Sequence, residues 1–298
     1  MILLRLEGGL GNIMFQYGLG RRLALRHGVE LKYDISSYQT NPLGDASFYL
    51  EVFEIDIANH LATTEEIASF VKYKPKQGRR WTLYNALFAN KRKYVIEKGP
   101  YFQPYALLTG PHAYIHGWWQ NEKYFADIRD ILLKDFTFRN QLIGKNKETA
   151  ERIRASNSIS MHVRRLDFVT NPKTRAYHGE LSKDYYDRAL TCITQKIPNP
   201  VLFVFSDDIP WVEKNFSFPY ETVYVGWNQE EEISYVDMHL MSLCKYHIIA
   251  NSAFSWWGAW LSSHTQKIVV APERWTNDPL DTNERVPLDW IKIANEAT

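Results

Sequence analysis

The sequence predicts an α/β protein built from parallel β-sheets in two domains, and three observations lead to that prediction. The chain has 298 residues, and a globular domain holds about 150 residues, so we expect two domains. It is 45% hydrophobic and 23% charged, a composition typical of globular proteins. Short apolar runs alternate along it with amphipathic stretches, which is the pattern of βα units. We place the domain boundary at residues 147/148, after a polar stretch over residues 140–147 that can join two domains.

The predicted elements are justified in chain order by periodicity and by capping residues. Residues 2–6 form the first strand, and residues 12–27 form a helix with Asn12 as its N-cap and Gly28 as its stop signal. Residues 63–110 have little periodicity, so we expect loops and short helices there. The other predicted strands are residues 29–33, 158–163, 201–205, 247–250 and 267–271, and the other predicted helices are residues 124–136, 148–155, 209–216, 231–246 and 255–263.

The charge balance and the cysteines exclude several classes of protein. Lys and Arg total 35 against 34 for Asp and Glu, a net charge of +1, which argues against a dedicated nucleic-acid binder. Cys192 and Cys244 are far apart and form no CxxC motif, so we expect neither a disulfide framework nor a zinc module, and a reducing compartment is the simplest setting. No apolar run approaches the roughly 20 residues of a membrane-spanning helix. We therefore expect a cytoplasmic protein without a transmembrane segment.

The first candidate binding segment is the glycine-rich turn after the first strand. Gly9, Gly11 and Asn12 lie in it. Glycines let the backbone approach a ligand, and the N–H groups at the start of a helix attract an anion. Position 14 is Met, so the dinucleotide-binding fingerprint is incomplete. A tight turn between strand and helix explains the glycines equally well.

The second segment follows the predicted strand 158–163. Arg164 and Arg165 are adjacent there, and guanidinium groups suit the oxygens of a diphosphate. A salt bridge to an Asp at the strand end is the alternative. His162 contacts a ligand or packs within its strand, and a packed histidine is the default.

The third and fourth segments also come just after predicted strands, where open α/β sheets bind ligands. Asp207 and Asp208 can hold a metal ion, ribose hydroxyls or a guanine edge, or they can cap the next helix. Asn251, Ser252 and Ser255 present polar groups at a helix start, where they bind an anion or cap the helix. For the tryptophans at 256, 257 and 260 we favour a place in the core.

A metal-dependent diphosphate site is not expected. No two Asp residues are spaced i, i+2, so the DxD motif that holds a metal and a diphosphate is missing. Arginines and helix ends would then have to neutralise a bound diphosphate.

Together these segments resemble the α-1,2-fucosyltransferases of glycosyltransferase family 11, especially the bacterial members. They span nearly the whole chain in the order of the family. The motifs that carry the resemblance are GGLGNIMFQY at residues 8–17, YDI at 33–35, GWWQNEKYF at 117–125, HVRRLD at 162–167, VFSDD at 204–208, IIANSAFSWWGAW at 248–260 and APERW at 271–275.

The resemblance implies a GT-B fold, in which two Rossmann-like domains face each other across a cleft. Residues 1–147 would be the acceptor-side domain and residues 148–298 the domain that binds GDP-β-L-fucose. It also implies inverting transfer of L-fucose to the 2-hydroxyl of a terminal β-galactoside, without an obligatory metal or other cofactor. Such an α-1,2 linkage belongs to glycan or lipopolysaccharide synthesis, which leaves peripheral contact with the inner membrane open.

The resemblance also implies roles for single residues. Arg164 would meet the donor diphosphate and steady GDP as it leaves, His162 and Asp207–Asp208 would lie near the guanosine, and Ser252, Phe254 and Ser255 would line the phosphate side. Asp167 and Glu7 are both candidates for the general base. The full set of expected donor-binding residues is Gly9, Gly11, Asn12, His162, Arg164, Arg165, Asp207, Asp208, Asn251, Ser252, Phe254 and Ser255.

Two departures from the family pattern bear on specificity. The family usually has Gln where this chain has Ile13, and Gly where it has Leu166. Ile13 removes an amide, and Leu166 adds bulk after the arginines. A GT-B enzyme that uses another nucleotide sugar and a catalytically silent glycan-binding protein both remain alternatives. The particular galactoside acceptor has no code that can be read from the sequence.

Overall fold

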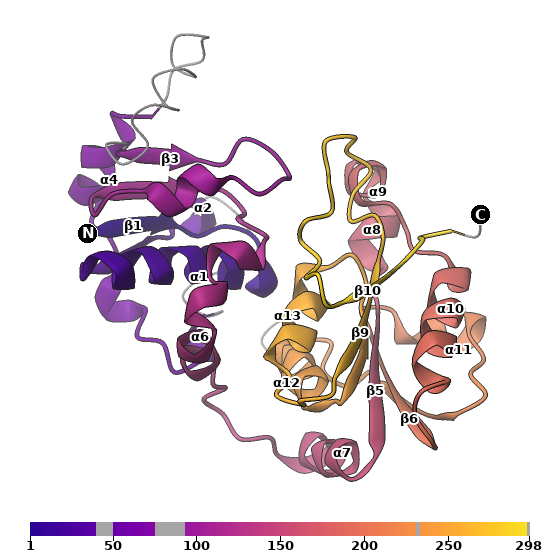
Figure 1. Cartoon of the computed structure of the whole chain (residues 1–298). Coiled ribbons are helices and arrows are strands. Elements are labelled where there is room, and N and C mark those ends of the chain that lie inside the picture. The colour runs from indigo at the N-terminus through magenta and orange to yellow at the C-terminus, as the bar shows by residue number, and fades with distance from the viewer. Residues whose placement is uncertain (40–49, 75–92, 231–232, 297–298) are drawn as a thin grey trace. The chain divides into compact units, whose positions relative to one another are not determined.

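The chain forms two compact units, Met1–Arg139 and Asn140–Thr298. The computed structural model in Figure 1 describes residues 1–39, 50–74, 93–230 and 233–296. The boundary between the units along the chain lies at Arg139/Asn140, whereas the sequence predicted it at 147/148. The reason is that part of the expected linker belongs to helix α7 (Gly144–Ala155), whose Ala150 and Ile153 lie in the core of the second unit.

Unit 1 is built on a parallel sheet with the strand order β2-β1-β4-β3. Its strands are β1 (Ile2–Arg5), β2 (Leu31–Asp34), β3 (Tyr94–Ile96) and β4 (Ala113–His116). Helix α1 (Leu10–His27) follows β1 and ends at Gly28, whose φ of 61° closes it as predicted. Its N-cap is Gly9. The prediction of Asn12 as N-cap was therefore wrong, because the chain already turns at Gly8, where φ is +85°.

The remaining described helical segments of unit 1 are short. Helix α4 starts at a capping box between Thr63 and Glu66, which lies in a stretch where the sequence showed little periodicity. The predicted helix 124–136 is broken at Phe125. The α-helices are α2 (Ser36–Gln39), α4 (Thr64–Val71) and α6 (Arg129–Asp135), and the 3-10 helices are η1 (Ala58–His60), η3 (Pro104–Leu108), η4 (Glu122–Tyr124) and η5 (Ala126–Ile128).

Unit 2 is built on a six-stranded parallel sheet with the order β10-β9-β8-β5-β6-β7. The central strand β5 alternates, so that Ile159, Met161 and Val163 join a core under α10 and α11. Figure 1 shows α12 and α13 on the opposite face of this sheet. The strands are β5 (Asn157–Val163), β6 (Pro200–Ser206), β7 (Glu221–Val225), β8 (Tyr246–Ile248), β9 (Ile268–Pro272) and β10 (Ile291–Ile293).

Helix α7 precedes β5, and the other described helices of unit 2 lie between these strands. The predicted helix 231–246 is shorter in the structure because Tyr246 already belongs to β8; residues 231 and 232 lie outside the described residues. No helix in the described ranges is long and apolar enough to cross a membrane. The helices are α7, α8 (Leu166–Thr170), α9 (Pro172–His178), α10 (Lys183–Thr194), α11 (Ile209–Asn215), α12 (Tyr235–Leu243) and α13 (Ala253–Leu261).

Candidate functional site

Three of the predicted segments meet at one edge of the sheet in unit 2. They follow β5, β6 and β8, which are neighbours in that sheet. Because the strands are parallel, their carboxyl ends share an edge, and this is where such sheets bind ligands. The nine expected donor-binding residues from His162 to Ser255 all belong to these segments.

Arg164 lies beyond the end of β5 with its guanidinium group partly open to solvent. Its Nη1 is 3.1 Å from Oδ2 of Asp207, and 33% of its side chain is exposed. The guanidinium carbon lies 5.8 Å from the centre of the Phe168 ring. A partly exposed cation at a strand end can approach an anionic ligand.

Arg165 has a different environment. Its side chain is only 11% exposed and forms ion pairs with Glu180 and, at 3.6 Å, with Asp208. Its guanidinium carbon lies 3.3 Å above the centre of the Trp211 ring, a cation–π contact. The salt-bridge alternative is therefore observed for both arginines, and Arg164 is the one whose side chain is more exposed to a ligand.

The two aspartates after β6 fix the local backbone. Asp207 Oδ1 accepts a hydrogen bond of 2.8 Å from the Arg165 amide. Asp208 is the N-cap of α11 and accepts from the Trp211 amide at 3.2 Å. Capping, the alternative weighed for Asp208, is thus observed, and the contact of either aspartate with a guanosine stays a prediction.

His162 is buried beneath this edge. Its ring lies 5.8 Å from that of Phe254, and its Nδ1 has no hydrogen-bond partner among the described residues. Burial, with a smaller contribution from the Arg164 charge, lowers the pKa of His162 to about 3. The imidazole is therefore neutral at physiological pH and can offer one donor and one acceptor.

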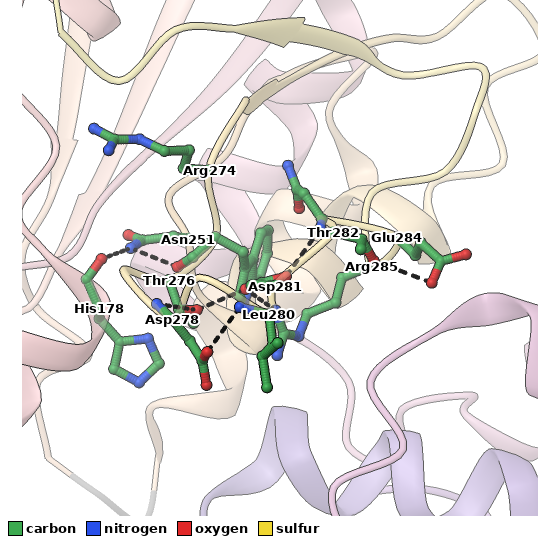
Figure 2. Close-up of polar contacts among 12 residues, drawn as sticks. His178, Asn251, Arg274, Thr276, Asp278, Leu280, Asp281, Thr282, Glu284 and Arg285 are labelled. Atoms are coloured by element: carbon green, nitrogen blue, oxygen red, sulfur yellow. Dashed lines mark hydrogen bonds and ion pairs between the residues drawn. The ribbon is translucent and has the colours of Figure 1, made fainter. Parts of the chain in front are cut away.

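The turn between β8 and α13 combines a buried anchor with an open helix start. The Asn251 amide donates to the carbonyl group of His178 at 2.9 Å (Figure 2) and to that of Trp275 at 3.1 Å. Ser252 is the N-cap of α13, but its side chain makes no capping hydrogen bond. Ser255 is buried and donates to the Ser252 carbonyl at 3.4 Å. The capping alternative is therefore not observed for the Ser252 side chain, and the first turn of α13 keeps amide groups that suit an anion.

Sequence reasoning missed a buried ion pair that supports this turn. Asp281 and Arg285 form it, with side chains 2% and 9% exposed. Asp281 also accepts from Thr276 at 2.7 Å (Figure 2), and the Arg285 carbonyl accepts from the Trp256 indole at 2.9 Å. Their i, i+4 spacing is a weak signal for a pair outside a helix. Trp256, Trp257 and Trp260 are buried, as favoured.

The remaining expected residues, Gly9, Gly11 and Asn12, belong to unit 1. A side chain at Gly8 would place its Cβ 2.6 Å from Nδ2 of Asn12, so this position needs glycine, and the tight-turn explanation of the motif holds for it. Asn12 Oδ1 accepts a hydrogen bond of 2.6 Å from Gln120. Contact of these residues with a donor stays a prediction.

Of the two candidate bases, only Glu7 has a described side chain. It lies 3.2 Å from Nε of Arg5 and 3.5 Å from Nε2 of His116. The contact with His116, followed by the charges of His116 and Arg5, holds the pKa of Glu7 below its usual value. Asp167 lies in α8, but its side chain is outside the described part of the chain.

Comparison with known proteins gives consistent relatives. The model of glycosyl transferase family 11 matches residues 55–294. An alpha-1,2-colitosyltransferase of Escherichia coli is 34% identical over 98% of this chain and 99% of its own length. The O-antigen biosynthesis glycosyltransferase WbnK of Escherichia coli is 34% identical over 91% of this chain and 93% of its own. A galactoside alpha-(1,2)-fucosyltransferase 1 of Leontopithecus chrysomelas is 24% identical over 54% of this chain and 46% of its own length.

Solved structures confirm the expected fold class. The fucosyltransferase NodZ from Bradyrhizobium superposes with a TM-score of 0.52 at 15% identity, covering 87% of this chain and 91% of its own. A mutant of Arabidopsis thaliana FUT1 in complex with GDP also superposes with a TM-score of 0.52, at 12% identity, covering 91% of this chain and 70% of its own. These likenesses show that each unit has the α/β architecture of a GT-B-like protein.

Proposed function

Because the chain belongs to glycosyltransferase family 11, we propose that it transfers L-fucose from GDP-β-L-fucose to the 2-hydroxyl of a terminal β-galactoside. Three relatives support this proposal through their names, which specify α-1,2 transfer of colitose or fucose and O-antigen biosynthesis. A NodZ structure of similar fold was soaked with GDP-fucose. The product would be an α-1,2 linkage in a glycan or surface polysaccharide.

The partly exposed guanidinium group of Arg164 at the end of β5 is the observation that supports the proposed donor site. The reaction is a direct displacement in which negative charge accumulates on the leaving diphosphate. Arg164, the first-turn amides of α13 and the hydroxyls of Ser252 and Ser255 would stabilise that charge more in the transition state than in the ground state. The anomeric centre is inverted because the hydroxyl attacks opposite the leaving group.

The proposal includes no divalent metal and no further cofactor. Arg164 and the start of α13 supply positive charge at the same sheet edge, which is the function that a metal ion has where a DxD motif binds a diphosphate. Asp207, which forms an ion pair with Arg164, is already engaged by that arginine and by the Arg165 amide. Transfer should therefore persist in excess EDTA.

A colitose donor is the second candidate, because the colitosyltransferase matches nearly the whole chain. Colitose is L-fucose without its 3-hydroxyl, so a donor site for it needs one polar group fewer. Leu166 lies directly after the two arginines and is 51% exposed, which suits a sugar face that lacks a hydroxyl. Ile13 is fully buried, so that departure changes the core of unit 1 rather than a ligand contact.

A donor screen tests both candidates. The purified protein is incubated with lactose and with GDP-fucose, GDP-colitose, GDP-mannose or UDP-galactose, with and without EDTA, and the product linkage is determined. GDP alone at 100 times its Kd should stabilise the fold by about 2.7 kcal/mol. Turnover with UDP-galactose alone would indicate a different nucleotide sugar. Lactose binding without any effect of GDP on thermal stability would favour the glycan-binding alternative.

A further inference from the structure

Trp118 is the only exposed tryptophan in the described part of the chain, with 45% of its surface accessible. Its neighbour Trp119 is fully buried and packs edge-on against Tyr124 at 5.4 Å. An exposed indole that is not needed for the core is the kind of side chain that binds the apolar face of a ligand.

The turn that presents this indole is fixed by specific contacts. The Glu97 carboxylate accepts hydrogen bonds from the amides of Trp118 at 2.7 Å and Trp119 at 3.1 Å. Trp119 has a φ of +54°, which costs energy for a residue other than glycine. Gly117 has a φ of +154°, and a Cβ there would lie 2.4 Å from that of Glu97. The surroundings thus impose this conformation on the turn.

The indole lies beside the glycine-rich turn that follows β1. A Cβ at Gly8 would be 2.8 Å from a ring atom of Trp118. The amides of Asn12 and Gln120, which are bonded to each other at 2.6 Å, come from the same two segments. A flat apolar ring beside amide groups provides both kinds of contact that a sugar needs, stacking on its C–H face and hydrogen bonding of its hydroxyls.

Glu7 is a second carboxylate at this edge, besides Glu97, whose oxygens already accept from the Trp118 and Trp119 amides. It follows β1, and its partners Arg5 and His116 come from β1 and the neighbouring β4. The other ring nitrogen of His116 lies 2.9 Å from the Tyr94 hydroxyl, which fixes the imidazole. Asp34 at the end of β2 is different, because it is buried and bonded to Tyr114 and to the Ser36 amide.

We propose that this edge of unit 1 binds the acceptor sugar, with Trp118 stacking on its apolar face and Glu7 accepting the proton of the attacking hydroxyl. The inference rests on the proposed function. As the hydroxyl oxygen bonds to the anomeric carbon of the donor, the bond from that carbon to the phosphate oxygen breaks. Its electron pair leaves with GDP, and the hydroxyl proton passes to the Glu7 carboxylate.

Stacking of the acceptor sugar on Trp118 is tested with Trp118→Ala and Trp118→Phe, using Tyr73→Ala as the matched control. Tyr73 is an exposed aromatic residue of the same unit, 41% accessible. It contacts Lys93, which precedes β3, so it lies toward the opposite edge of the sheet. Trp118→Ala should raise the acceptor KM about tenfold, while Trp118→Phe and Tyr73→Ala stay within about threefold of the unaltered protein. Donor hydrolysis without acceptor should not change.

Direct binding separates this inference from the proposed function. Saturation-transfer NMR with lactose reports acceptor binding without a donor, and the thermal shift with GDP reports donor binding without an acceptor. Loss of the lactose signal in Trp118→Ala, with the GDP shift kept, supports stacking of the acceptor sugar on Trp118. An unchanged lactose signal or acceptor KM in that variant would overturn it. Absence of a GDP shift in the unaltered protein would instead overturn the donor assignment.

Glu7→Gln tests the proton acceptor. A general base contributes about 100-fold or more to a reaction rate, so kcat should fall by at least that factor. The acceptor KM and the GDP thermal shift should stay unchanged. A kcat within threefold of the unaltered protein would remove Glu7 from the chemistry, and a rise in KM alone would make it a binding residue.

Discussion

Arg164 and Arg165 are neighbours in the sequence with opposite surroundings. The first has a partly exposed guanidinium beside Asp207, and the second is enclosed by Trp211, Glu180 and Asp208. Both follow a buried strand, so the sequence predicts two cations at its end but does not say which of them faces a ligand. That difference is set by side chains from other elements.

Replacing Arg164 should abolish most activity and leave the fold intact. Removal of one group that stabilises developing charge costs about 2.7–4 kcal/mol, so kcat/KM of Arg164→Ala should fall roughly 100- to 1,000-fold. Its pair with Asp207 is partly exposed, and such pairs contribute at most about 1 kcal/mol to stability. Steady-state kinetics and thermal melting check both expectations. Near-normal turnover would remove Arg164 from the mechanism.

Replacing Arg165 should have the opposite effect. Arg165→Ala removes the cation between Glu180 and Asp208 and the contact with Trp211. Breaking a largely buried ion pair leaves carboxylates without compensation, and we expect a loss of about 2 kcal/mol in the free energy of unfolding. Urea unfolding measures it. Unchanged stability together with lost GDP binding would instead assign Arg165 to the ligand.

At the scale of elements, the strands that the sequence predicts best are buried apolar runs. β5 and β6 lie close to their predicted positions because both are seven residues long and packed on both faces. β3 is only three residues long, too short for a periodicity to appear. Because β3 was not predicted, the position of Glu97 at a strand end could not be recognised from the sequence. The turn that Glu97 holds determines that Trp118 is exposed and Trp119 is buried, so this difference could not be predicted either.

Helix α12 is tied to its neighbours by a buried polar network. Asp237 accepts a hydrogen bond of 2.8 Å from Asn228, and Asn146 in α7 accepts from Asn228 at 3.0 Å and from Trp227 at 2.7 Å. Burial raises the pKa of Asp237 to about 7, opposed by the Asn228 hydrogen bond. The carboxyl group is therefore protonated in the fold at pH 5, where an unfolded chain would have it ionised.

This network predicts a pH-dependent effect of Asp237→Asn. The folded pKa is above the unfolded one, so the wild-type fold loses stability as the pH rises from about 4 to about 7, by about 1.4 kcal/mol per unit at most. The amide variant lacks that titration. Its unfolding free energy should match wild type below about pH 4 and exceed it by a few kcal/mol at pH 8, measured by urea unfolding. Equal pH slopes in both proteins would contradict the buried neutral carboxyl.

At the scale of the whole molecule, length and alternation were sufficient to predict two parallel-sheet units. The boundary was displaced because residues 140–147 have a polar composition like that of a linker, although helix α7 starts at Gly144 and packs into unit 2. Composition cannot distinguish an exposed helix start from a connecting segment. The predicted sheet edge of unit 2 was found correctly because a parallel sheet brings every carboxyl end to one side.

Two fully buried histidines should contribute strongly to how the chain responds to acid. His162 and His247 are both in unit 2, and burial, with nearby positive charges, lowers the pKa of each to about 3. Their folded pKa is below the unfolded value near 6.5, so the unfolded chain takes up protons that the fold does not as the pH falls below 6.5. Each histidine then costs about 1.4 kcal/mol of stability per pH unit.

The acid response is measured most clearly in the Asp237→Asn background, because Asp237 titrates with the opposite sign. Between pH 6.5 and 5 the free energy of unfolding should fall by about 3 kcal/mol from the two histidines together. His247→Gln in that background keeps a polar side chain near Ser160, whose Oγ lies 2.8 Å from the histidine Nδ1. It should remove about half of the part that these two histidines contribute, while His239, whose pKa burial lowers to about 4, adds to the decrease in both proteins. If the slope were the same with and without His247, then this buried imidazole would not be what limits the fold in acid.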